Sequence, residues 1–181
     1  MNRRLWPLAV SLCLVAVGAT QAQTLRWASA GDAQTMDPDS QNETLTNMMN
    51  GQVYERLVMR DKSLNIVPQL ALSWQQTSPT RWRFKLRPGV KFHDGTPFTA
   101  DDVVFSVERA RQPSSQIAGY ATALGEVKKI DATTVDFIQK DPNPIFLHHL
   151  DLIYIMSKAW CETHKVTKPQ SFKDKEETFA A

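Results

Sequence analysis

The sequence lacks the residues and spacings on which several common classes of protein depend. It has two cysteines and seven glycines among 181 residues, and no glycine-rich loop of the kind that holds phosphates. The motifs of serine hydrolases and zinc peptidases are also missing. Its 21 Lys and Arg nearly balance 19 Asp and Glu, so there is no basic excess to neutralise nucleic-acid phosphates. These absences argue against a nucleic-acid-binding protein and favour binding over catalysis.

The first 22 residues have the organisation of a secretory signal peptide. A basic start over residues 1–4 precedes an apolar run over residues 8–19, and small residues then lead to a predicted cleavage site after Ala22. The run is shorter than the ~20 apolar residues that a membrane-spanning helix needs. Cys13 follows the bulky Leu12, where a lipoprotein signal has a small residue. We therefore interpret Cys13 as part of a leader that is removed on export.

Removing this leader leaves equal numbers of positive and negative side chains, and Cys161 as the one cysteine. An intrachain disulfide is then impossible, even in an oxidising compartment. Cys161 and His164 have the spacing of two metal ligands one helical turn apart, but a structural zinc site needs four ligands and no matching pair exists. His148, His149 and Asp151 form a loose polar cluster with no partner set. We expect no metal and no other cofactor.

The start of the exported chain predicts a strand, a loop and a helix in that order. Residues 25–28 alternate between apolar and polar side chains, and residues 29–38 are rich in turn formers. Residues 43–60 have a helical period, which predicts one helix ending near residue 60. Its Met-rich stripe is interpreted as core packing, because Met fills irregular gaps. The apolar residues of this period are Leu45, Met48, Met49, Val53 and Leu57.

From residue 67 onward, short strands alternate with short helices. Residues 81–87 alternate between cationic and apolar side chains, which predicts a half-buried strand with a solvated basic face. Thr99, followed by Asp101 and Asp102, is typical of a helix N-cap and first turn. The resulting order predicts a mixed α/β fold with no regular βαβ alternation. The expected elements are a hairpin of 67–77 with 82–87, a helix of 99–112, a loop containing Gly119 and Tyr120, a hairpin of 127–130 with 134–138, a helix opening at Asn143-Pro144, and a short helix around Trp160.

Three stretches occur in an informative order: YERL at residues 54–57, PQLALSW at 68–74, and WRFKLRPGVKFHDGTPFTADDV at 82–103. With the Phe-Ser pair at 105–106, they closely resemble the bacterial extracellular solute-binding proteins of family 5, the peptide, dipeptide and nickel-complex receptors of ABC importers. The resemblance implies part of a periplasmic-binding-protein type II clamshell. Because family members are several-fold longer, we expect an incomplete first lobe plus the extra family subdomain, with the second lobe absent.

The resemblance also implies an organisation and a function. We expect a signal peptide at 1–22, the start of lobe I at 23–60, a lobe I subdomain specific to the family at 61–160, and a truncated connection at 161–181. The function implied is that of a non-enzymatic periplasmic receptor, which delivers a di- or oligopeptide to an ABC permease complex at the inner membrane. Two alternatives stay open: another ligand such as a nickel chelate, opine or sugar, and a fragment without binding activity. No nucleic-acid partner is expected.

Candidate substrate-binding residues follow from the resemblance at five positions. Ser29, Ala30, Gly31 and Asp32 match the loop in which family members contact the ligand backbone, and Tyr120 matches a pocket-lining aromatic residue. Backbone groups beyond a strand end can pair with an extended peptide, and Gly31 permits close approach. The structural alternatives are a plain strand-to-helix connection and a packed loop tyrosine.

Overall fold

The structure is a computed structural model that describes residues 28–171, 173–178 and 180. The chain divides into two compact units, residues 1–30 and 31–181, and the account below concerns the second unit. The predicted signal peptide and all but the last residue of the predicted first strand lie outside the described residues. Within the described residues, no helix is long and apolar enough to cross a membrane.

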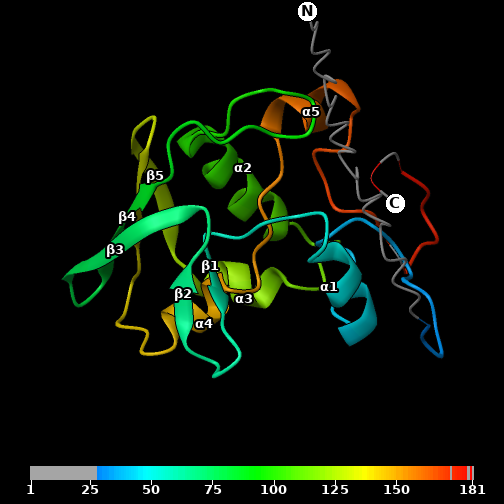
Figure 1. Cartoon of the computed structure of the whole chain (residues 1–181), viewed down its shortest axis with the longest axis horizontal. Coiled ribbons are helices and arrows are strands. Elements are labelled where there is room, and N and C mark those ends of the chain that lie inside the picture. The colour runs from blue at the N-terminus through cyan, green and yellow to red at the C-terminus, as the bar shows by residue number, and fades with distance from the viewer. Residues whose placement is uncertain (1–27, 172, 179, 181) are drawn as a thin grey trace, which may run out of the picture. The chain divides into compact units, whose positions relative to one another are not determined.

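A four-stranded antiparallel sheet with the order β3-β4-β6-β5 contributes Phe84, Leu86, Val135 and Phe137 to the main hydrophobic core (Figure 1). It consists of β3 (Ala71–Ser78), β4 (Arg81–Leu86), β6 (Thr134–Ile138) and β5 (Glu126–Asp131). Both predicted hairpins are confirmed, β3 with β4 and β5 with β6. Residues 66–68 instead form β2 (Ile66–Pro68), which pairs with β1 (Val58–Arg60) in a separate two-stranded sheet. The alternation predicted for β4 is also confirmed, since Phe84 and Leu86 are buried while Arg81 and Lys85 are exposed.

The first helix is much shorter than its sequence period predicts. α1 spans Thr44–Asn50, so the expectation of one helix reaching residue 60 is wrong. Glu43 caps its start, because the carboxylate accepts the N–H groups of Leu45 and Thr46. Asn50 and Gly51, both poor helix formers, stand where it ends.

The Met-rich stripe of α1 does not form core. Met48 is 52% exposed, whereas the polar residues Thr46 and Asn50 are buried. Leu57 is fully buried, but it lies beyond the helix, in a bend immediately before β1. The apparent period therefore joined residues of two different conformations, and the prediction of core packing for this stripe is wrong.

The helix after Thr99 begins as predicted. α2 (Ala100–Ala110) has a capping box, in which the Asp102 carboxylate accepts the Thr99 N–H at 2.9 Å. Asp101 and Asp102 also complement the dipole of its first turn. The helix packs against β5 and buries Val103 and Val107 completely (Figure 1).

Three short helices complete the fold. The loop expected around Gly119 and Tyr120 is α3 (Ala118–Ala123), so that prediction is wrong; apart from Gly119 its residues are compatible with a helix. α4 (Phe146–Leu150) begins after Asn143-Pro144 rather than with it, because the Asn143 side chain accepts the Ile145 N–H and closes a turn first. α5 (Lys158–Thr163) confirms the short helix around Trp160.

One face of α2 is polar yet buried. Asp102, Ser106 and Arg109 follow one another at steps of four and three residues, and all three are buried; we call them the polar stripe. The Asp102 carboxylate accepts the Lys158 N–H at 2.9 Å, and the Ser106 hydroxyl accepts the Met156 N–H at 2.9 Å. The side chains of the polar stripe thus hold the backbone of residues 156–158, where α5 begins.

Arg109 is the most heavily bonded member of the polar stripe. Its fully buried guanidinium pairs with Asp37 at 2.6 Å and with Asp39 at 2.5 Å. It also donates to the backbone carbonyl oxygens of Val166 at 3.1 Å and Lys168 at 3.0 Å. A single side chain therefore joins α2 to two segments from opposite ends of the compact unit.

Removing this guanidinium should destabilise the fold strongly. We expect Arg109→Ala to cost about 3–5 kcal/mol of unfolding free energy, because it leaves Asp37 and Asp39 buried without a counter-charge. Urea denaturation followed by circular dichroism measures the loss. Arg81→Ala is the matched control, since Arg81 is an exposed arginine on β4. Equal losses in the two variants would contradict the assigned role of Arg109.

Asp39 should make stability depend on pH. Burial raises its pKa from 3.8 to about 7; the Arg109 charge opposes the shift, and the Asp37 charge adds to it. Two carboxylates share one guanidinium, and Asp39 Oδ1 is buried with no hydrogen-bond partner among the described residues. The pKa of Asp39 is therefore higher in the folded chain than in the unfolded chain, so the folded state binds a proton more tightly. The stability that this proton contributes is complete below about pH 4 and is lost as the pH rises through about 7.

Asp39→Asn tests this pH dependence, because asparagine keeps the side-chain shape and cannot ionise. Between pH 5 and pH 8, the unfolding free energy of the unmodified chain should fall relative to that of the variant. The slope should reach at most about 1.4 kcal/mol per pH unit. Urea denaturation at several pH values measures both curves. Parallel curves would show that Asp39 does not titrate in this range.

Candidate functional site

The predicted loop contacts lie in an exposed part of the chain. Gly31 and Asp32 are both exposed, and neither backbone N–H donates to another described residue. The Asp32 carboxylate instead accepts the N–H of Ala33 at 2.8 Å. Ser29 and Ala30, which belong to the other compact unit, are exposed as well. Backbone N–H groups that no other described residue accepts, as at Gly31 and Asp32, are what an extended ligand could use.

The chain immediately after this loop is firmly held. Gln170 accepts the Thr35 hydroxyl at 2.8 Å through its side-chain oxygen, and its backbone oxygen accepts the Ser40 hydroxyl at 2.9 Å. Its N–H donates to the Asp37 carboxylate at 2.8 Å, beside Arg109. The exposed loop residues therefore precede a buried, fully polar anchor.

Tyr120 lies on α3 and is 36% exposed. Its ring contacts that of His149 on α4, with centroids 5.8 Å apart and planes tilted by 56°. Among the described residues, no hydrogen bond or ring contact joins Tyr120 to Gly31 or Asp32. The structure thus shows no such link between Tyr120 and Gly31 or Asp32, and the ligand roles of all five residues stay predictions.

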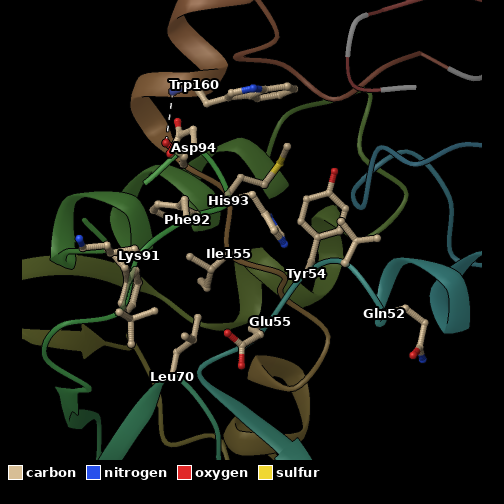
Figure 2. Close-up of a pocket in the computed structure, with 15 residues that line it drawn as sticks. Gln52, Tyr54, Glu55, Leu70, Lys91, Phe92, His93, Asp94, Ile155 and Trp160 are labelled. Carbon is tan, nitrogen blue, oxygen red and sulfur yellow. Dashed lines mark hydrogen bonds between the residues drawn. The ribbon is translucent and has the colours of Figure 1, made fainter. Parts of the chain in front are cut away.

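Sequence reasoning missed an open cavity of about 700 Å³. Its walls are formed mainly by three segments of chain, residues 52–55, 90–94 and 155–157. Figure 2 shows the His93 ring directed toward Tyr54. Asp94 is already engaged, since its carboxylate accepts the N–H and the hydroxyl of Thr96, and these bonds lower its pKa. Aromatic and charged side chains of the lining include Tyr54, Phe92, Phe98 and Trp160 with Glu55 and Lys91.

The cavity lies beside the place where residues 55–56 and 154–155 pair with each other. The Ile155 N–H donates to the Glu55 carbonyl at 2.8 Å, and Arg56 pairs with Tyr154 as an antiparallel bridge. The Arg56 guanidinium lies 4.2 Å from the Tyr154 ring centre and 3.3 Å from the Asp151 carboxylate. These contacts hold together two segments that are distant in the sequence. The second of them also bonds to the polar stripe of α2, because the Met156 N–H donates to the Ser106 hydroxyl.

Among the described residues, the candidate metal pair has no further ligands arranged around it. Cys161 is buried, and burial raises the pKa of its thiol to about 12. No group of three or more potential ligands is arranged to hold a metal ion anywhere in the described part of the chain.

Comparison with known proteins decides the family. Residues 65–180 match the family described as bacterial extracellular solute-binding proteins, family 5 Middle. The chain belongs to this family. The resemblance inferred from the three sequence stretches is therefore confirmed. Family 5 proteins bind solutes rather than transform them, which also confirms the prediction of a non-enzymatic protein.

Individual family 5 proteins match most of this chain. It is 33% identical over 180 residues to the dipeptide-binding protein of Escherichia coli K12, covering 86% of this chain and 34% of that protein.

Among solved structures, the binding protein MoaA of A. tumefaciens R10, in complex with mannopinic acid, is 32% identical. Its TM-score is 0.66 over 74% of this chain and 29% of that one. The periplasmic binding protein DppA of Helicobacter pylori, in complex with the peptide STSA, is 25% identical with a TM-score of 0.64, over 74% and 31% of the two chains. The predicted mixed α/β class is confirmed, and the chain spans about a third of the length of the proteins that it matches.

Proposed function

We propose that this chain is part of the substrate-binding component of an ABC importer for di- or oligopeptides. The observation that carries the proposal is the 33% identity to a dipeptide-binding protein over 86% of this chain. The similarity to a structure holding the peptide STSA supports the same ligand class. In the complete receptor, a ligand bridging two lobes would stabilise the closed state through its higher affinity for that state.

The geometry supports a peptide through the backbone at Gly31 and Asp32. Their N–H groups make no hydrogen bond to another described residue, so they can pair with a peptide main chain as an added strand does. Ser29 and Ala30 extend the same sequence segment. Tyr120 supplies an exposed ring for a ligand side chain. These five residues are the proposed substrate contacts.

The cellular setting follows from the same proposal. The basic start, apolar run and small residues of residues 1–22 support export with cleavage after Ala22. The exported chain would act in the periplasm and deliver its ligand to a permease complex at the inner membrane. The proposed organisation keeps residues 23–60 as the start of lobe I, 61–160 as the family subdomain and 161–181 as a connection to the rest of that lobe.

A second candidate ligand is a solute that is not a peptide. The structure with mannopinic acid is 32% identical, almost as high as the identity to the dipeptide-binding protein.

A third candidate is a fragment that does not bind alone, because the chain spans about a third of the length of its relatives. Half of the free energy of a ~1 μM complex corresponds to a dissociation constant of only ~1 mM.

Thermal unfolding with added ligand distinguishes these candidates. Mass action predicts a higher melting temperature only for a solute that binds the folded state, with about 2.7 kcal/mol gained at one hundred times Kd. We expect an increase with the tetrapeptide Ser-Thr-Ser-Ala at millimolar concentration. An increase with mannopinic acid alone would favour the second candidate. No increase with either solute would overturn peptide binding by this chain.

Gly31→Ala should weaken peptide binding without affecting the fold. An added Cβ would lie 3.5 Å from Leu45 Cδ2, an ordinary contact distance, so we expect unchanged unfolding. The same methyl group would obstruct the main chain of a bound peptide. We expect the Kd for Ser-Thr-Ser-Ala to rise roughly threefold to tenfold, equivalent to about one hydrogen bond. Isothermal titration calorimetry measures both Kd values.

Gly119→Ala is the matched control for this substitution. Its Cβ would meet no atom within 4 Å, and it lies on α3. Its Kd for the peptide should equal that of the unmodified chain. A Kd raised equally in both variants would remove the assignment of Gly31.

A further inference from the structure

Asn143 connects the end of α3 to α4 through one side-chain amide. Its Oδ1 accepts the Ile145 N–H at 3.1 Å, which fixes the orientation of the amide. Nδ2 then faces the carbonyl oxygen of Ala123, at 3.3 Å, and Nδ1 of His149, at 3.2 Å. Because Nδ2 can only donate, Nδ1 of His149 must accept. The network therefore assigns the imidazole proton to Nε2 and leaves the ring neutral.

The neutral His149 ring packs against the exposed ring of Tyr120. The two centroids are 5.8 Å apart, and the contact joins α4 to α3. α3 has only six residues and no side-chain cap at its N-terminus, so little within the helix itself holds it. At its C-terminal end, the Ala123 carbonyl accepts from both Asn143 and Gln139. Tyr120 is thus positioned from one side by His149 and along the helix by Asn143.

We propose that His149 is a positioning residue of the ligand site, which holds Tyr120 for the solute when neutral and releases it when protonated. This inference rests on the proposed function, since Tyr120 is a ligand contact only there. His149 itself touches no solute in this proposal. It acts through the Tyr120 ring and through the hydrogen bond to Asn143.

Protonation reverses the chemistry of the hydrogen bond at Nδ1. A proton there would turn the acceptor into a donor and point it at the Asn143 amide group, which can only donate. The titratable groups that interact with the His149 ring are Tyr120 from α3 and His148 from its own helix, and Asn143 carries no charge. Burial, and then the His148 charge, lower the pKa of His149 below its usual 6.5. The ring is therefore neutral at pH 7 and becomes charged only at a pH below the usual value of 6.5.

Nuclear magnetic resonance tests the coupling without any ligand. In the full chain labelled at histidine and tyrosine, the Tyr120 ring signals should shift with the midpoint of the His149 titration, below pH 6.5. His149→Phe keeps a ring against Tyr120 but has no Nδ1, so it should abolish the shift. His148→Gln is the matched control on the same helix and should keep it. Tyr120 ring signals that do not shift as His149 titrates would overturn the inference.

Peptide binding then tests the consequence for function. Between pH 7.5 and a pH below the measured midpoint of the His149 titration, the Kd for Ser-Thr-Ser-Ala should rise roughly threefold to tenfold in the unmodified chain and in His148→Gln, as expected for the loss of about one hydrogen bond. In His149→Phe the Kd should not depend on pH in this range. A pH-independent Kd in the unmodified chain would overturn the inference while leaving the proposed function intact. No binding at pH 7.5 would instead overturn the proposed function, and the spectroscopic coupling would still decide the role of His149.

Discussion

Arg109 is an arginine without contact to solvent, and the arrangement of the chain around it depends on that burial. A buried guanidinium is tolerable only with counter-charges and hydrogen-bond acceptors on all sides. Here Asp37 and Asp39 come from the segment after the exposed loop, and two carbonyl oxygens come from residues 166–168. Neither segment belongs to a helix or strand. Their positions are therefore set by what Arg109 requires rather than by local secondary structure.

The family signature contributes to this arrangement through α2. The turn at Asp94 and Thr96 and the capping box at Thr99 are both in the signature, and together they fix where the helix begins. The start of the helix determines which side chains face inward at steps of four and three residues. The signature thus acts at a distance, by placing Asp102 and Arg109 against the segments that they bind, and its residues 90–94 also line the cavity.

Much of the fold was accessible from the sequence, and the failures have physical causes. The strict alternation of β4 and the Thr99 cap are local signals, and both predicted their elements correctly. α1 was overextended because Leu57 is buried for a tertiary reason and merely falls on the helical period. The pairing of Arg109 with Asp37 joins residues 72 positions apart and has no local signal. The polar residues Asp102, Ser106 and Arg109 were visible at helical spacing, however, and could have indicated a buried network.

The candidate site shows the same division between local and long-range information. The loop residues and Tyr120 came from resemblance, whereas the bonds of Gln170 to the segment after the loop and the contact of His149 with Tyr120 emerged only from the structure. Two titratable groups of these surroundings, Asp39 and His149, respond to acid in opposite ways. A raised pKa at Asp39 preserves the anchor of the loop below pH 7, whereas protonation of His149 breaks its bond to Asn143. Acid below the His149 midpoint would then loosen Tyr120 while the segment after the loop stays anchored, so that the affinity changes without unfolding.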